Sequence, residues 1–154
     1  MWHDQAIARI EFHLEIPRPA HVVFAYLIDP TRMHEWDPQI VEIAHEPPGP
    51  LTVGTRIRQI RAVLRRRVAL TLEVTELEEP VLLAMRIIEG PLPLEIRTVL
   101  EPQGATARAH VSATGELNGL ARVAEPALAR AAKRQLRTYY ESLRQCLAAD
   151  GDDS

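Results

Sequence analysis

Hydrophobic and polar residues alternate along the first segment of the chain, Ile7 to Ile16. Every second side chain here is apolar, and the apolar face carries Ile10, Phe12, Leu14 and Ile16. The opposite face carries Arg9, Glu11, His13 and Glu15. A period of two is typical of a strand with one face in the core and one face in water. The pattern therefore predicts a half-buried strand that ends at Pro17.

Two short helices are predicted after this strand. Apolar residues recur at helical spacings of three and four, at Val22, Val23, Tyr26 and Leu27. Pro19 suits the first turn of this helix, which stops at Asp29 because a residue before proline disfavours helical backbone. A second helix is predicted to run to Glu35, where residues 36–38 (Trp-Asp-Pro) break the pattern.

The period returns to two in the middle of the chain. Residues 40–43 predict a strand that leads into the proline-rich loop 47–50, and another strand is expected after Gly54. The next strand has Val68, Leu70, Leu72 and Val74 on one face, with Arg65, Arg66 and Arg67 as the turn before it. Three more strands are predicted: Val81 to Glu89, Leu92 to Glu101 and Ala105 to Gly115. Seven strands with short connections predict a mostly antiparallel sheet.

The C-terminal segment has a helical period instead. Its apolar face carries Leu120, Val123, Ala127, Leu128, Ala131, Leu136, Tyr139, Tyr140, Leu143 and Leu147. From Pro126 to Ala149 a helix would be about 36 Å long at 1.5 Å per residue. Pro126 either opens this helix, which we favour, or kinks a longer one. We expect one domain over residues 1–149 and a disordered acidic tail over residues 150–154.

This order of elements resembles a known superfamily. The matching pieces are Ile16-Pro17-Arg18-Pro19 before Val23–Leu27, Asp29-Pro30 before Trp36-Asp37-Pro38, Gly49-Pro50, Val53-Gly54-Thr55 and the amphipathic C-terminal helix. Together they resemble the START-like (SRPBCC) superfamily of birch-pollen-allergen-type proteins, lipid-transfer domains and polyketide cyclase/dehydrase-like proteins. The resemblance covers nearly the whole chain.

The resemblance implies an α+β helix-grip fold. A curved antiparallel sheet of seven strands would wrap around the long C-terminal helix, with two short helices between the first two strands. It also implies an elongated cavity between sheet and helix. Members of the superfamily bind lipids, sterols, polyketides, plant hormones or quinones, and some catalyse cyclisation or dehydration. The fold by itself selects none of these functions.

Composition narrows the classes of function. The 154 residues are 46% hydrophobic and 25% charged, as in ordinary globular domains. A net charge of -3 argues against a general nucleic-acid binder. Cys146 is the only cysteine, so no internal disulfide can form. No secretory signal or membrane-spanning run is visible, which favours a cytoplasmic protein. Either a monomer or a homodimer fits these data.

The predicted strand Ala105 to Gly115 carries unusually small side chains on its apolar face, namely Ala107, Ala109, Val111 and Ala113. They either leave space for a ligand or let the helix approach the sheet closely. Trp36 either packs the loops or contacts the ligand. The residues predicted to line a ligand cavity are Trp36, Leu70, Leu72, Met85, Ile87, Leu94, Ile96, Ala109, Val111, Tyr139, Tyr140 and Leu143.

No catalytic group, metal site or cofactor is predicted. The ionisable residues on the central strands all fall opposite the apolar face: Glu73, Arg86, Glu95, Arg97 and His110. A cluster of arginines is either a solvated outer face or a docking patch for an anionic membrane or acidic partner: Arg56, Arg58, Arg61, Arg65, Arg66 and Arg67. The leading hypothesis is a carrier of a hydrophobic molecule. The alternatives are a cyclase or dehydratase, and an interaction domain with a collapsed cavity.

Overall fold

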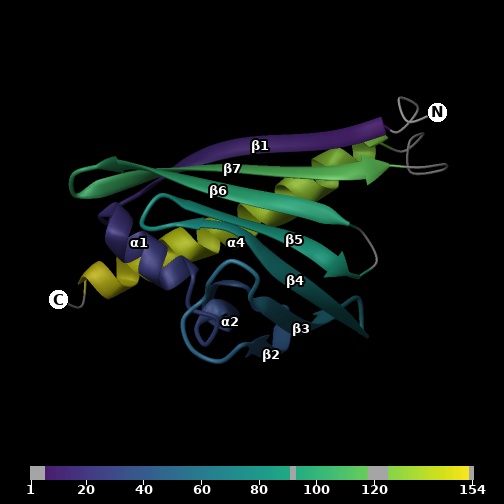
Figure 1. The fold of residues 1–154 in the computed structure, drawn as a ribbon. Coiled ribbons are helices and arrows are strands. Elements are labelled where there is room, and N and C mark those ends of the chain that lie inside the picture. Colours follow the sequence, from purple (N-terminus) through teal and green to yellow (C-terminus); the bar gives the residue numbers. More distant parts are fainter. Residues whose placement is uncertain (1–5, 91–92, 118–124, 153–154) are drawn as a thin grey trace.

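The computed structural model describes residues 6–90, 93–117 and 125–152 and contains one antiparallel sheet (Figure 1). Its strands are β1 (Ala6–Ile16), β2 (Ile40–Glu46), β3 (Arg56–Val63), β4 (Arg66–Glu78), β5 (Leu82–Glu89), β6 (Leu94–Gln103) and β7 (Thr106–Leu117). They lie in the order β1-β7-β6-β5-β4-β3-β2, so each strand after β2 pairs with its chain neighbour. β1 forms one edge of the sheet and pairs with β7, the last strand in the chain.

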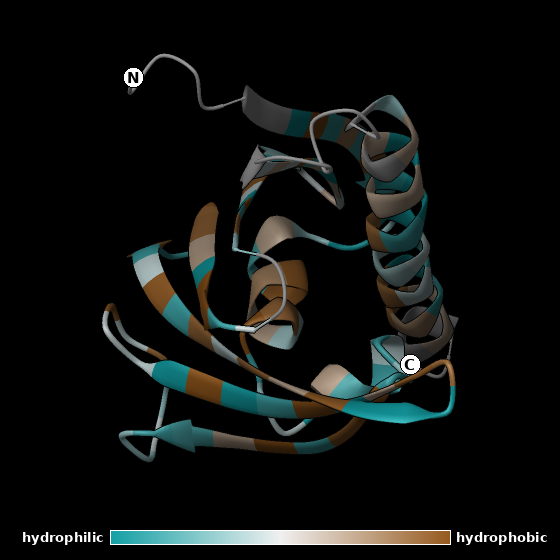
Figure 2. Ribbon diagram, turned by 90° about the vertical axis from the view of Figure 1, so that its right-hand side faces the viewer, coloured by the Kyte–Doolittle hydropathy of each residue, from teal (hydrophilic) through white to brown (hydrophobic). Residues whose placement is uncertain are grey.

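Three helices accompany the sheet in the described part of the chain: α1 (Ala20–Leu27), α2 (Met33–Trp36) and α4 (Glu125–Asp152). In the chain, the two short helices come between β1 and β2. The long helix crosses the sheet (Figure 1). The sheet curves around the side on which α4 lies (Figure 2). This arrangement confirms the predicted helix-grip fold.

Alternating strands place one face of the sheet in the core. Along β1 the apolar residues Ile10 to Ile16 are buried, whereas Arg9, Glu11, His13 and Glu15 are exposed, as predicted. β1 packs against α4, and α1 packs against β6 and β7. Burying each large aliphatic side chain stabilises the fold by about 1.5–3 kcal/mol relative to leaving it in water. The core therefore holds the concave face of the sheet against the helices.

Element boundaries differ from the predicted ones at several points. The turn between β3 and β4 is Leu64-Arg65, and both residues have positive φ, 50° and 65°. A two-residue hairpin of this kind needs positive φ at both positions because only then does the turn match the twist of the strands. Arg66 and Arg67 therefore belong to β4 and not to the turn. The sixth and seventh strands each begin and end slightly later than predicted.

The long helix also differs from its prediction in phase and length. The described helix runs from Glu125, and the segment that would decide whether Pro126 opens or kinks it lies outside the described residues. Leu120 and Val123 lie outside the described residues. Ala127 and Ala131 are exposed, whereas Ala129 and Ala132 line the interior. The helix continues to Asp152, into the segment predicted as a tail.

Candidate functional site

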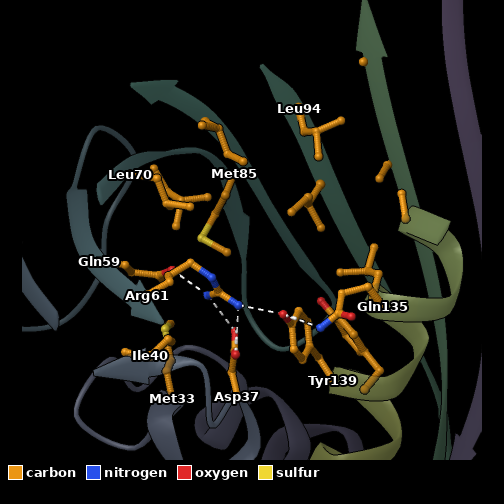
Figure 3. Close-up of a pocket in the computed structure, with 18 of the residues that line it drawn as sticks. Met33, Asp37, Ile40, Gln59, Arg61, Leu70, Met85, Leu94, Gln135 and Tyr139 are labelled. Carbon is orange, nitrogen blue, oxygen red and sulfur yellow. Dashed lines mark hydrogen bonds and ion pairs between the residues drawn. The ribbon is translucent and has the colours of Figure 1, made fainter. Parts of the chain in front are cut away.

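A cavity of about 330 Å³ lies between the sheet, α2 and α4 (Figure 3). Most of its lining is apolar: Ile10, Met33, Trp36, Ile40, Leu70, Leu72, Met85, Ile87, Leu94, Ile96, Ala113, Gly115, Ala129, Ala132, Leu136 and Tyr140. The polar lining residues are Asp37, Gln59, Arg61, Gln135 and Tyr139. Pockets for small molecules are usually apolar with a few convergent polar groups, and their volumes range from about 300 to 1,000 Å³. The cavity fits this class at its lower end.

Small residues on both walls create the space. Ala113 and Gly115 lie near the end of β7, and Ala129 and Ala132 lie on α4. A Cβ atom at Gly115 would come within 2.6 Å of the Leu94 side chain on β6. The glycine therefore lets Leu94 pack directly over β7 at this end of the cavity. Elsewhere on β7, Ala107 and Ala109 are fully buried in packed core.

The main polar feature of the cavity is an ion pair between Asp37 and Arg61. Asp37 lies directly after α2, and Arg61 lies on β3. The two terminal nitrogens of Arg61 donate to both carboxylate oxygens of Asp37, each over 2.9 Å. Both side chains are largely buried, with 11% and 8% of Arg61 and Asp37 exposed. A bidentate pair of this kind is geometrically specific as well as strong.

Three further side chains complete the polar cluster around Arg61. The guanidinium also donates to Oε1 of Gln59 over 3.0 Å, to Oε1 of Gln39 over 3.2 Å and to the Tyr139 hydroxyl over 2.8 Å. The Tyr139 hydroxyl donates to Gln39 and accepts from Nε2 of Gln135. Residues from the α2–β2 connection, β3 and α4 therefore meet at one end of the cavity, and Figure 3 shows Arg61 between Asp37 and Tyr139.

Burial and charge act in opposite directions on this pair. Burial raises the pKa of Asp37, and the hydrogen bonds and charge of Arg61 oppose that rise. Burial is the largest single effect on Arg61 and lowers its pKa, but the hydrogen bonds and charges of Asp37 and Tyr139 together outweigh burial, so the pKa is raised. The guanidinium remains charged at any physiological pH. Its charge is compensated inside the protein by the nearest carboxylate.

Two aromatic residues form the wall beside this cluster. The Tyr140 hydroxyl lies 2.6 Å from the Thr98 hydroxyl, and burial raises the pKa of Tyr140 to about 12 despite this hydrogen bond. Trp36 packs against Tyr140 with ring centroids 6.0 Å apart. The buried indole N–H of Trp36 has no hydrogen-bond partner in the described part of the chain.

The structure brings most of the predicted ligand residues to the cavity. Those that line it are Trp36, Leu70, Leu72, Met85, Ile87, Leu94, Ile96, Tyr139 and Tyr140. Ala109, Val111 and Leu143 do not line it. Ala109 and Val111 precede the cavity residues of β7, and Leu143 follows those of α4, in closely packed core. Open space therefore lies beside one end of the small-residue strand, whereas Ala107 and Ala109 are buried in packed core. The cavity lies beside Ala113 and Gly115 and not along the whole strand.

Tyr139 was predicted, but the other polar residues of the site were missed or misplaced from the sequence: Asp37, Gln59, Arg61 and Gln135. Arg61 was grouped with the outward arginines, but it points into the cavity and must be removed from that cluster. Strand alternation carries the missing signal, since Ile57, Gln59 and Arg61 share one face of β3 and Ile57 is buried. An arginine on an apolar face indicates a buried partner, but the sequence does not reveal that Asp37 supplies it.

The predicted outward positions agree with the structure. Glu73 pairs with Arg56 and Arg86, Arg97 pairs with Glu76, and His110 pairs with Glu101, while Glu95 is exposed. None of them lines the cavity. Within residues 6–90, 93–117 and 125–152, no group of three metal-binding side chains occurs. None of the described helices is long and apolar enough to cross a membrane.

A curved antiparallel sheet that wraps around a long helix, with an apolar cavity between them, is the architecture of the START-like (SRPBCC) class of proteins. The family described as polyketide cyclase / dehydrase and lipid transport matches residues 8–148. The chain therefore belongs to this family. A search of curated proteins by sequence gives no significant match.

Solved structures with the same fold have low sequence identity. Ara h 8.0201 aligns with a TM-score of 0.78 and 15% identity over 94% of this chain and 99% of its own. A START superfamily protein from Mycobacterium smegmatis aligns with 0.75 and 15% over 92% and 98%. Norcoclaurine synthase from Thalictrum flavum, in complex with dopamine and hydroxybenzaldehyde, aligns with 0.73 and 13% over 94% and 88%. These similarities concern the fold.

Proposed function

We propose that this protein binds or carries a hydrophobic small molecule, such as a lipid, polyketide, quinone or sterol-like compound, in the cavity between the sheet and α4. The observation that carries the proposal is the apolar cavity of about 330 Å³. Protein interiors are normally close-packed, and empty space forfeits contacts on every wall. A ligand that fills the cavity restores those contacts, and membership of a polyketide and lipid-transport family supports this role.

The volume favours a compact ligand. It lies at the lower end of the range for small-molecule sites, which suits a ring system or a short chain better than a lipid with two long chains. The norcoclaurine synthase complex with dopamine and hydroxybenzaldehyde supports a ring compound, since both of those ligands are small aromatics.

A ligand panel with a cavity-filling variant tests the proposal. Thermal shift and native mass spectrometry are measured with lipids, sterols, quinones and polyketides. At least one class of ligand is expected to bind the wild-type protein. Ala113→Leu places a larger side chain in the cavity beside β7 and is expected to weaken that binding about tenfold or more. Ala62→Leu, at an exposed position on β3, serves as the matched control. No ligand from the whole panel, or equal binding by both variants, would contradict the proposal.

A cyclase or dehydratase is the second candidate, because Asp37 and Arg61 bring two ionisable groups into one cavity. General acid–base catalysis needs a group that can exchange a proton with the substrate. Both Asp37 oxygens already accept hydrogen bonds from Arg61, so the carboxylate is not placed to exchange a proton with a substrate. This geometry supports binding better than catalysis. If the protein turns over a polyketide substrate and Asp37→Asn abolishes this turnover, catalysis would become the better-supported function.

We further propose that the tip of the β3–β4 hairpin contacts anionic membranes. Leu64 is 92% exposed at this tip, and Arg65, Arg66 and Arg67 beside it are all exposed. An apolar residue among arginines suits a surface of anionic lipid, where each arginine contributes about 1 kcal/mol of attraction. The hairpin would then deliver the protein to a source of hydrophobic ligand.

Vesicle co-sedimentation tests this contact. Wild type is expected to bind phosphatidylserine vesicles at low salt and to release them at high salt, because salt screens exposed charges. Leu64→Asn with Arg65→Gly should lose the binding, whereas Arg130→Gln, at an exposed position on α4, should retain it. Equal binding to neutral vesicles, or no loss in the hairpin variant, would contradict this proposal.

A further inference from the structure

Arginine inside an apolar cavity is ordinarily a receptor for a carboxylate. Its planar guanidinium presents donors in a fork that matches two carboxylate oxygens. Arg61 lines the cavity and is largely buried, so position alone suggests a site for fatty acids or other organic acids. The hydrogen bonds around Arg61 instead disfavour the binding of a carboxylate.

The donors on the two terminal nitrogens of Arg61 are already occupied. One nitrogen donates to Asp37 and Gln59, and the other faces Asp37, Gln39 and the Tyr139 hydroxyl. Each terminal nitrogen carries two N–H groups, so each has at least as many acceptors as it has hydrogens. A ligand carboxylate could bind to both terminal nitrogens of Arg61 only by displacing some of these partners.

The negative charge of Asp37 opposes such a displacement. Its carboxylate lies 2.9 Å from Arg61 and lines the same cavity. A second carboxylate would bring two like charges together in a largely buried site, and one of them would lack a cation. A neutral hydroxyl or carbonyl group brings no such cost, because it can share hydrogen bonds with the amide and phenol groups of Gln59, Gln135 and Tyr139.

From this geometry we infer that the cavity selects uncharged ligands and that Asp37 is the residue that excludes carboxylates. The inference rests on the proposed binding function and names the chemical class of its ligand: an apolar molecule whose polar group is a hydroxyl, carbonyl or ether. Arg61 acts in this site as the partner that holds Asp37, Gln59 and Tyr139 in position.

Two probes with the same ring system test the inference in wild-type protein. Binding of 2-naphthol and 2-naphthoate is measured at pH 7.5 by calorimetry. The phenol is neutral at this pH and the acid is charged. Naphthol is expected to bind about tenfold or more tightly than naphthoate, since the hydrogen bonds of the charged acid would replace existing ones. Tighter binding of naphthoate would overturn the inference and leave the proposed function standing. Binding of neither probe, together with no binder in the ligand panel, would contradict both.

A variant without the Asp37 charge tests the role of that residue. Asp37→Asn is expected to raise the affinity for naphthoate about tenfold or more, because Arg61 then lacks a counter-charge, and to leave naphthol nearly unchanged. Glu42→Gln removes the same charge from an exposed position on β2 and should change neither affinity. An unchanged naphthoate affinity in a folded Asp37→Asn protein would overturn the inference.

The double variant Asp37→Asn with Arg61→Gln keeps the test decisive if the single variant does not fold. It removes both charges together, and replacing a whole buried pair costs much less than breaking it. The double variant is expected to prefer naphthol, as wild type does. This variant has no cation for a carboxylate, so naphthoate should gain no affinity in it. A gain would show that Asp37 does not exclude carboxylates by occupying Arg61, and it would overturn the inference.

Discussion

At the scale of single residues, the buried Asp37–Arg61 pair is the most informative feature of the molecule. The two residues lie 24 positions apart in the chain and meet only because β3 packs beside the segment after α2. Removing one partner of a buried pair leaves an uncompensated charge, which is costlier than losing an exposed pair. The loss of either partner alone should therefore destabilise the fold.

Asp37→Ala is expected to lower the free energy of unfolding by about 3–5 kcal/mol, the usual cost of breaking a buried pair. Urea denaturation measures the change. Glu11→Ala serves as the control, since Glu11 pairs with Arg9 on the exposed face of β1 and its loss should cost about 1 kcal/mol or less. A similar cost for both variants would mean that the Asp37–Arg61 pair contributes no more than a surface pair.

Tyr140 gives a prediction for alkaline pH. Its pKa in the folded protein is about 12, above the ordinary value of about 10, because the phenol is buried. A raised pKa contributes stability that is fully present below pH 10 and is lost as the pH rises toward 12. Between pH 9 and 11 this group should remove about 1 kcal/mol from the free energy of unfolding. Tyr140→Phe should lack that part of the decline, measured by urea denaturation at both pH values.

At the scale of elements, the β3–β4 hairpin shows a conflict between residue type and backbone. Leu64 and Arg65 both adopt positive φ, which costs a residue with a side chain about 1–2 kcal/mol. Asparagine and glycine are the usual residues in such a turn. The exposed Leu64 therefore occupies a position that local stability does not favour, in keeping with a surface role for the tip.

Leu64→Asn with Arg65→Gly is expected to raise the free energy of unfolding by about 1–2 kcal/mol, because the turn loses its strain. The same variant should lose vesicle binding, so reduced binding could not be attributed to unfolding. Ala62→Gly, in the β3 strand beside the turn, is the control and should destabilise the protein by about 0.5–1 kcal/mol. Lower stability of the turn variant would contradict the assignment of strain.

At the scale of the whole molecule, a bound ligand should couple to global stability, because the cavity walls come from the sheet, α2 and α4 together. At a ligand concentration of about 100 times Kd, the free energy of unfolding should rise by about 2.7 kcal/mol. For a chain of this length that corresponds to a rise in Tm of roughly 5–10 °C. A ligand that binds by calorimetry without raising Tm would contradict binding to the native cavity.

Local patterns account for much of the fold. The period of two in β1 and β4, the helical spacing in α1 and the long C-terminal repeat are consequences of backbone geometry, so they are visible in the sequence. The same alternation predicted that Leu70, Met85 and Ile96 point inward, and all three line the cavity. Positions in the long helix were predicted less well, since Ala127 and Ala131 proved to lie outside and Ala129 and Ala132 inside.

The sequence by itself determined the elements, their order and the inward face of most strands, because these depend on contacts between residues close in the chain. Only the tertiary structure decided where the cavity lies along β7, and that Arg61 turns inward to meet Asp37, Gln39 and Tyr139. Such contacts join residues distant in the chain, and they depend on how the sheet curves and where α4 crosses it. The physical reason is that periodicity reports which face is buried, whereas partners are chosen by packing in three dimensions.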